Sequence, residues 1–360
     1  MRTTRPRPFV VKLALLLVIA LVANYLADFA LGAYATLSGV AWEDFRAANR
    51  LDCVFVGSSY AERAFDPTVY DEVLGGRSVN LSTPGQMLSD SCDAAREAID
   101  EKGARRIVVG IGIETFTTSV DPYSCVPFLR ARYRDDPVGL AGELARLACD
   151  PEVITTKSSL NVLFPWTFTS VHSVSGILDN VQARIARAPL GPSAEKVIPG
   201  WHYVGQGYGN YDRTLDPASP DTTVSVYGIP EARQDCLDQL RELCMLCRER
   251  GVELVVVATP HPAFDLIALG EVYPTTMGSV RDLVEGEGAH YVDLSLARDE
   301  VLSLALEDFG DYEHLNFSGA RLATRALADI VRRRDAGEDV SSDFYTYDEW
   351  DAWVADHAEP

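Results

Sequence analysis

The chain has 360 residues, a net charge of −21 at neutral pH and 47% apolar residues. This composition is typical of a globular protein with room for one large domain or two ordinary ones. Because such an acidic surface repels nucleic acid and anionic lipid headgroups, we expect no nucleic-acid partner.

Residues 1–35 differ from the rest of the chain. Four basic residues among the first twelve lead into an apolar stretch, and residues 9–27 contain only Lys12 and Asn24 as polar side chains. These 19 residues are close to the length that spans a bilayer. We interpret the segment as an uncleaved single-pass anchor, with a cleaved secretory signal and a buried helix as the alternatives. The basic start predicts a cytoplasmic N-terminus and an extracytoplasmic domain.

Beyond the anchor, short apolar runs alternate with amphipathic stretches. Such alternation predicts an α/β domain with a doubly wound, five-stranded parallel sheet. The predicted strands are residues 51–57, 78–81, 106–113, 252–258 and 290–294, and the predicted helices are residues 66–75, 90–102, 230–250, 279–287 and 316–333. The helix boundaries follow capping residues and glycines, such as Asp66 before Pro67 and Gly103 after Lys102.

Polar residues follow each predicted strand. Ser58 and Ser59 follow the first strand, Gly85 the second, Glu114 the third, His261 the fourth, and Asp311 and His314 the region after the fifth. In a doubly wound sheet, ligands bind outside the carboxyl ends of the strands. We therefore expect these residues to share one edge of the sheet, with His261 either in the pocket or structural.

Three of these residues fit a nucleophile, a base and an orienting carboxylate. A serine hydroxyl is a poor nucleophile at neutral pH, so it needs a neutral imidazole to accept its proton. The imidazole in turn needs a carboxylate to fix its tautomer. Ser59, His314 and Asp311 supply this set, and Asp311 lies three residues before His314. The spacing predicts a serine hydrolase or acyltransferase.

The segments 54–59, 80–85 and 311–316 make the chain resemble the SGNH hydrolase superfamily, which has a flavodoxin-like sheet. The resemblance is to its membrane-anchored branch, which includes the alginate acetylation proteins and the D-alanyl-lipoteichoic-acid biosynthesis protein. It implies Ser59 as nucleophile, His314 as base and Asp311 as its orienter. It also implies the backbone amides of Ser59 and Gly85 as oxyanion donors, and a membrane O-acyltransferase as donor partner.

Two positions depart from that pattern. The family usually offers an asparagine to the oxyanion where this chain has Glu114, and an ionised carboxylate cannot donate a hydrogen bond. A backbone amide or Thr115 then substitutes, or the enzyme is weak, or the site no longer catalyses. The family's usual Gly-Asp-Ser places the nucleophile third, which selects Ser59 over Ser58.

Cysteines do not indicate a metal site. Cys244 and Cys247 have a two-residue gap, but they lie in a helical stretch with no second pair nearby. We interpret them as buried helix-face residues, and we expect no metal or diffusible cofactor.

The sequence thus predicts an SGNH-like domain over residues 36–335 with an insertion at about 117–223, followed by an acidic, aromatic tail over 336–360 that is a docking or flexible segment. We expect it to transfer or remove an acyl group on a cell-envelope polysaccharide. The alternatives are a non-catalytic scaffold or glycan-binding module, which Glu114 favours, and a secreted lipase or peptidase.

Overall fold

A five-stranded parallel sheet forms the centre of the protein. The structure, a computed structural model, describes residues 8–117, 120–155, 159–216, 221–228 and 231–358. The strand order is β2-β1-β3-β6-β7, so the strands in chain order are arranged 2-1-3-4-5, as in flavodoxin-like doubly wound folds. The strands are β1 (Cys53–Gly57), β2 (Ser78–Asn80), β3 (Arg106–Ile111), β6 (Glu253–Ala258) and β7 (His290–Asp293). The predicted α/β fold class is confirmed.

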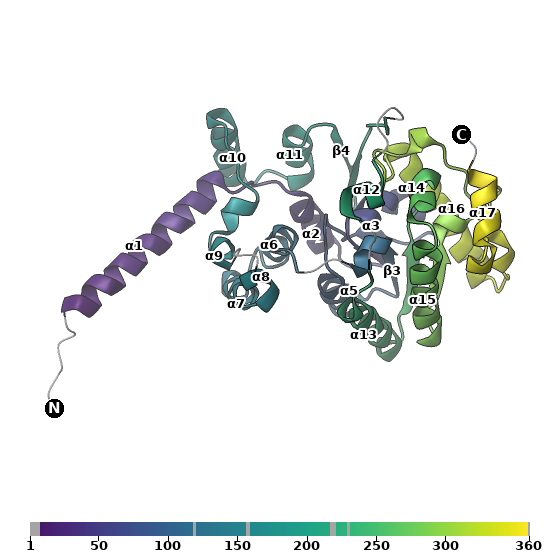
Figure 1. Cartoon of the computed structure of the whole chain (residues 1–360). Helices are drawn as coiled ribbons and strands as arrows, with labels where there is room; N and C mark the ends of the chain where they lie inside the picture. Colours follow the sequence, from purple (N-terminus) through teal and green to yellow (C-terminus); the bar gives the residue numbers. More distant parts are fainter. Residues whose placement is uncertain (1–7, 118–119, 156–158, 217–220, 229–230, 359–360) are drawn as a thin grey trace.

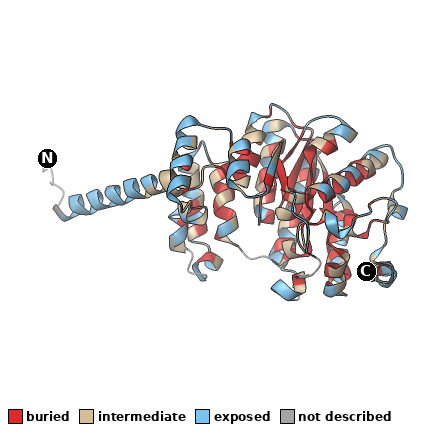
Figure 2. Cartoon of the chain, turned by 90° about the horizontal axis from the view of Figure 1, so that it is seen from above, coloured by how far each residue is buried: buried red, intermediate tan, exposed pale blue. Residues whose placement is uncertain are grey.

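Helices cover both faces of this sheet because successive strand residues point to opposite sides. In β1, Val54 and Val56 join one hydrophobic cluster and Phe55 joins the other. Figure 2 shows the buried strands at the centre, flanked by helices. The first cluster includes residues of α2 (Leu37–Ala47), α5 (Leu88–Lys102), α13 (Gln234–Arg250) and α15 (Val272–Gly286), and the second includes residues of α3 (Ser59–Ala64), α4 (Pro67–Leu74) and α16 (Phe317–Asp335).

Several element boundaries differ from the predicted ones. The third strand ends at Ile111 rather than residue 113, because a short 3₁₀ helix, η1 (Ile113–Phe116), follows Gly112. The fourth crossover contains two helices, α14 (Ala263–Leu269) and α15, which are separated at Gly270 with φ +55°. The prediction placed the start of α15 seven residues late, at Ser279, because Pro274 and Gly278 weaken the helical pattern of its first half.

An apolar helix, α1 (Pro8–Leu31), projects from the domain in Figure 1. Its segment Phe9–Leu31 has a mean hydropathy of 2.4 and is long and apolar enough to cross a membrane. Its two polar residues near the end contact the domain. The amide of Asn24 accepts a hydrogen bond from the Trp166 indole at 3.0 Å, and Asp28 pairs with Arg130. The end of α1 is therefore docked on the domain.

The region between β3 and α13 holds more regular structure than the sequence indicated. Most of its helices lie between α1 and the sheet in Figure 1. They are α6 (Pro122–Arg132), α7 (Pro137–Ala148), α8 (Pro151–Thr155), α9 (Ser159–Val162), the 3₁₀ helix η2 (Pro165–Phe168), α10 (Val174–Ala186), α11 (Leu190–Val197) and α12 (Thr223–Tyr227). A two-stranded hairpin of β4 (Trp201–Gly205) and β5 (Tyr208–Tyr211) completes the region, and Asn80 of the edge strand β2 donates to its turn at Gln206.

The acidic C-terminal segment packs on the domain. It forms α17 (Trp350–His357), whose Trp350 and Trp353 are buried in the first hydrophobic cluster. The hydroxyl of Tyr347 donates to Asp293 at the end of β7. The expectation of a flexible or docking segment is wrong for the described part of this tail, because its aromatic rings supply core contacts that its many acidic residues conceal in the sequence.

Candidate active site

A sharp turn after β1 places Ser59 at the carboxyl edge of the sheet. Gly57 has φ +142°, and a Cβ atom there would lie 2.5 Å from the carbonyl oxygen of Gly110. A Cβ atom on Gly110 would lie 2.6 Å from the Cβ atom of Ala61. Only glycine fits both positions, and the two glycines let α3 approach β3 closely. Ser59 is the first residue of that helix, so its position is fixed by this contact.

The loop before α16 presents His314 and Asp311 at the same edge. The side chain of Asn316 accepts hydrogen bonds from the backbone N–H groups of Ser318 and Gly319, at 3.0 and 3.1 Å, and so caps α16. The carbonyl of His314 accepts from the N–H of Gly310 at 2.8 Å. This closed loop holds the imidazole and the carboxylate together, with Nδ1 of His314 2.8 Å from Oδ1 of Asp311.

The structure brings the three residues predicted to act together into one hydrogen-bonded chain. Nε2 of His314 lies 2.8 Å from the hydroxyl oxygen of Ser59, and its Nδ1 faces Asp311. Burial lowers the pKa of His314 below its usual value of 6.5, although Asp311 opposes that change. A neutral imidazole between a hydroxyl and a carboxylate can accept the hydroxyl proton at Nε2.

Two arginines that the sequence analysis missed hold Asp311 ionised. Oδ2 of Asp311 lies 3.3 Å from Nη1 of Arg63 and is also hydrogen-bonded by Arg213. Burial alone would raise the pKa of Asp311, but the hydrogen bond to His314 and the nearby positive charges outweigh it and hold that pKa well below its usual range. Arg63 follows Ser59 by four residues, a spacing that puts both on one side of a helix and was available in the sequence.

Tyr60 forms a layer behind this chain. Its ring stacks between two imidazoles, with centroids 5.3 Å from His261 and 5.4 Å from His314. Its hydroxyl contacts two carboxylates, Glu114 and, at 2.9 Å, Glu313. A phenol has one proton to donate, so only one carboxylate receives it at a time. Burial raises the pKa of Glu313, and burial with the two carboxylates raises that of Tyr60.

His261 lies on the far side of Tyr60 from His314, and it is not among the residues that line the cavity described below. Its Nδ1 is 2.9 Å from the buried carboxylate of Asp265, which also accepts hydrogen bonds from the backbone and hydroxyl of Thr223. Burial lowers the pKa of His261, but Asp265 and the nearby glutamates outweigh it and raise the pKa to about 9. The carboxylate of Asp265 therefore favours the protonated form of His261 beside the glutamates around Tyr60.

Ser59 opens into a cavity of about 620 Å³. Its lining residues come from the segments that follow β1, β2 and β3, the start of α6, the end of α12, the segment before α13 and the His314 loop. They are Ser58, Ser59, Tyr60, Gly85, Gln86, Met87, Glu114, Thr115, Thr117, Asp121, Ser124, Tyr227, Glu231 and Glu313. The cavity thus contains the nucleophile candidate, both predicted oxyanion positions and four carboxylates. The predicted pocket residues Ser58 and Glu114 line it.

The backbone conformation and a close contact both require glycine at position 85, the predicted oxyanion position. Its φ is +66°, and a Cβ atom would lie 2.1 Å from the hydroxyl of Ser124, which in turn contacts Asp121. The backbone there is therefore left-handed and pressed against α6. Opposite it, Glu114 is hydrogen-bonded by Tyr60, so its charge is partly offset by a donor that the sequence did not indicate.

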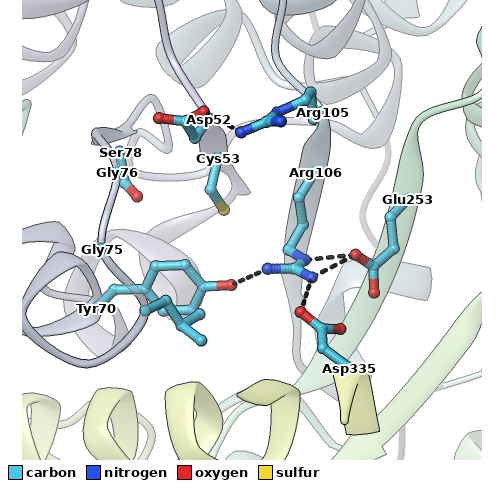
Figure 3. A pocket seen from close by; sticks show the side chains of 11 residues that line it. Asp52, Cys53, Tyr70, Gly75, Gly76, Ser78, Arg105, Arg106, Glu253 and Asp335 are labelled. Atoms are coloured by element: carbon cyan, nitrogen blue, oxygen red, sulfur yellow. Dashed lines mark hydrogen bonds and ion pairs between the residues drawn. The ribbon is translucent and has the colours of Figure 1, made fainter. Parts of the chain in front are cut away.

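A second cavity, of about 420 Å³, lies at the opposite edge of the sheet (Figure 3). Arg106, the first residue of β3, points into it and pairs with Glu253 and Asp335 at 2.6 Å each. Nearby Cys53 is buried, and its pKa is raised to about 12, so its thiol is unreactive. The polar groups of this cavity pair with one another, as expected for a structural network at the amino ends of the strands.

Within the described ranges, no group of three or more His, Cys, Asp or Glu side chains could hold a metal ion. Cys244 and Cys247 are buried on α13 and form no disulfide, which confirms their interpretation as helix-face residues.

Comparison with protein-family models and with curated protein sequences finds no match. Among solved structures, a candidate acylhydrolase from Bacteroides fragilis is similar over 84% of this chain and 98% of its own, with 7% identity and a TM-score of 0.37. A catalytic mutant of the acetylxylan esterase Axe2 from Geobacillus stearothermophilus is similar over 81% of this chain and 96% of its own, with 11% identity and a TM-score of 0.35.

Proposed function

We propose that this chain is a membrane-anchored serine esterase or acyltransferase that acts on an acyl ester of a cell-envelope glycan. The observation that carries the proposal is the hydrogen-bonded chain from Ser59 through His314 to Asp311, which opens into a cavity of about 620 Å³. No metal or diffusible cofactor is needed for this chemistry.

The reaction follows from the order of the groups. Ser59 Oγ attacks the ester carbonyl while its proton moves to Nε2 of His314, and Asp311 stabilises the imidazolium that forms. In this proposal the backbone amides of Ser59 and Gly85, two residues that line the cavity, donate to the developing oxyanion. The tetrahedral intermediate then expels the alcohol, which takes the proton from Nε2, and leaves an acyl ester on Ser59. Water or a glycan hydroxyl repeats these steps in reverse, so the acceptor decides between hydrolysis and transfer.

The cavity supports a polar rather than a lipid substrate. Its lining includes the hydroxyl-bearing residues Thr115, Thr117 and Ser124, and Met87 is its one aliphatic or sulfur-containing apolar side chain among the described lining residues. Hydroxyl and carboxylate groups are hydrogen-bonding partners for sugar hydroxyls. A lipase would need an apolar acyl site, so the glycan ester is favoured over a lipid ester.

The proposed anchor is α1. In this proposal the basic N-terminus stays on the cytoplasmic side of the membrane, and the domain lies on the outer side. Its test is fractionation: the full chain should remain in the membrane after alkaline extraction, and a protease added to intact cells or right-side-out vesicles should digest the domain. Protection of the domain from external protease would contradict the orientation. A membrane O-acyltransferase is the donor partner that the family resemblance implies.

The chemistry is tested with a fluorophosphonate probe and a small aryl acetate. Wild-type protein should be labelled at Ser59 and should release the aryl alcohol, and Ser59→Ala should lose both. Ser58→Ala is the matched control because it changes the adjacent hydroxyl in the same cavity, and it should keep labelling. Labelling that survives Ser59→Ala would reassign the nucleophile.

A non-catalytic glycan-binding scaffold is the second candidate, and Glu114 is the observation that favours it. Its carboxylate lines the cavity where an oxyanion would need donors, and repulsion there would cost about 3 kcal/mol of transition-state stabilisation. Absence of labelling together with saturable binding of envelope oligosaccharides would support this candidate instead.

A further inference from the structure

A third cavity lies where α1 meets the domain, and it shares no lining residue with the candidate active site. It has a volume of about 890 Å³, and α1 contributes Tyr25, Asp28 and Phe29 to its lining. Five arginines line it against three carboxylates, in a chain whose net charge is −21. The arginines are Arg46, Arg130, Arg134, Arg184 and Arg187, and we refer to this site as the arginine cavity.

The arginines are only partly neutralised by the protein. Arg130 pairs with Asp28, and Arg134 lies 3.3 Å from Glu43. Arg184 donates one hydrogen bond to the carbonyl of Gly32 at 2.7 Å, but its buried Nε has no hydrogen-bond partner among the described residues. Burial lowers the pKa of Arg184; Asp28 opposes this change, and the neighbouring Arg130 adds to it. A buried cation with unfilled donor capacity is costly unless an anion completes it.

Arg46 repeats this pattern on the other side of the arginine cavity. Its Nη1 donates to the carbonyl of Ala131 at 2.9 Å, and its buried Nη2 has no hydrogen-bond partner in the described part of the chain. Its Nε, however, lies 3.8 Å from the carboxylate of Asp135, so its charge is paired. Arg187, at the end of α10, is exposed and forms no ion pair with any described residue. The three carboxylates of the arginine cavity thus pair with Arg46, Arg130 and Arg134, one each. Arg184 and Arg187 have no carboxylate partner among the described residues and leave two positive charges for an anion. Guanidinium groups bind phosphate oxygens in a bidentate manner.

The position of the arginine cavity selects the kind of anion. The 23 residues Phe9–Leu31 would form about 35 Å of helix, so the last turns of a spanning α1 lie at the level of the lipid headgroups. Tyr25 on those turns is 67% exposed, and Leu163 and Phe164, which approach α1 beside Asn24, are 50% and 44% exposed. Exposed aromatic and apolar residues of this kind are typical of a membrane interface.

We propose that the arginine cavity binds the phosphate group of an anionic membrane lipid, with the acyl chains running along α1. The inference uses only the anchor part of the proposed function and is independent of the chemistry at Ser59. The remainder of the acidic domain repels an anionic bilayer, so this local cluster would set the domain's distance and orientation relative to it.

The test uses the full chain in a non-ionic detergent after removal of bound lipid. Short-chain phosphatidylglycerol, short-chain phosphatidylcholine and inorganic phosphate are titrated separately, with native mass spectrometry and thermal shift as the measurements. Phosphatidylglycerol should bind at least tenfold more tightly than the other two. Equal binding of phosphatidylcholine would overturn the proposal, and equal binding of inorganic phosphate would overturn its assignment to a lipid.

Variants separate this site from the rest of the protein. Arg184→Gln with Arg187→Gln should weaken phosphatidylglycerol binding at least tenfold. If that variant does not fold, Arg187→Glu is tested instead, because Arg187 is exposed and forms no ion pair with a described residue. Arg187→Glu should weaken phosphatidylglycerol binding several-fold. Arg325→Gln on α16, whose side chain is 58% exposed, is the matched control and should bind as the wild type does.

Unchanged binding in the arginine cavity variants would overturn the proposal. Fluorophosphonate labelling of Ser59 in the same samples reports the proposed function independently. Lipid binding without labelling would contradict only the esterase assignment. Labelling without lipid binding would contradict only the assignment of a lipid phosphate to the arginine cavity.

Discussion

The ring of Tyr60 stacks on the imidazole of His314, with centroids 5.4 Å apart and planes inclined by 25°. Tyr60 is the residue after Ser59, so one short helix carries both the hydroxyl that faces the imidazole edge and the ring that covers its face. The orientation of His314 is therefore set by packing as well as by its hydrogen bond to Asp311. The following variants separate these contributions.

Tyr60→Phe should destabilise the protein while keeping the ring stack. The half-buried carboxylates Glu114 and Glu313 would lose the phenol proton that they share, at a cost of about 1–3 kcal/mol in the free energy of unfolding. The loss should be larger at pH 8 than at pH 5, because burial raises the pKa of Glu313 and the unpaired ionised form is the costly one. Thermal unfolding at both pH values measures it. Tyr123→Phe, whose side chain is 63% exposed, is the control; an equal loss there would contradict the argument.

The pH dependence of kcat/KM reports on His314. Only its neutral form accepts the Ser59 proton, and burial lowers its pKa below 6.5. Activity should therefore rise with pH and reach half of its plateau below pH 6.5. Aryl acetate turnover from pH 4.5 to 8 measures this. His172→Gln, which changes a histidine outside the cavity lining, should leave the profile unmoved. A half-point above pH 7 would be inconsistent with a buried neutral imidazole.

Asp311→Asn should reduce kcat about 10³- to 10⁴-fold, because an amide favours the wrong tautomer of His314. It should also change acid stability. The pKa of Asp311 is held low in the folded protein, so its ionised form contributes stability above the unfolded pKa of about 3.9, and this contribution is lost as pH falls below that value. The variant should have a lower free energy of unfolding than the wild type at pH 7. On acidification this free energy should fall less in the variant than in the wild type. Asp299→Asn, in an exposed turn, should change neither kinetics nor acid unfolding.

Gly85→Ala and Gly103→Ala form a matched pair. Both glycines have left-handed backbones, with φ +66° and +65°, so alanine should cost each about 1 kcal/mol. Only at Gly85 would the new Cβ meet another group, the Ser124 hydroxyl at 2.1 Å, whereas nothing lies within 4 Å at Gly103.

If the Gly85 amide is an oxyanion donor, its displacement should lower kcat about 10²- to 10³-fold. Gly103→Ala should keep full activity. Equal kinetics for the two variants, measured on folded protein, would remove Gly85 from the oxyanion site.

The sheet and the proximity of Ser59 to His314 could be predicted because they depend on local signals. Apolar runs bounded by glycines indicate buried parallel strands, and the carboxyl ends of such strands share one edge. Asp311 and His314, which are three residues apart, are in direct contact because one closed loop contains both.

The layer around Tyr60 could not be predicted in the same way. Glu114, Glu313 and His261 come from three separate segments, and their meeting at one tyrosine depends on how closely α3 packs on β3. A Cβ atom on Gly112 would lie 2.8 Å from the Tyr60 ring, so a glycine with no recognisable motif makes room for it. The arginine cavity was missed for a similar reason, because its arginines are scattered over a region with weak helical periodicity.

The 255-residue separation between the Ser59 hydroxyl and the His314 imidazole also bears on when the protein becomes competent during biosynthesis. The N-terminal helix emerges from the ribosome first, and the serine follows within some thirty residues of its end. The imidazole arrives only when nearly nine-tenths of the chain has been made. A nascent or truncated chain that lacks His314 therefore carries the Ser59 hydroxyl without the imidazole that lies 2.8 Å from it in the folded protein.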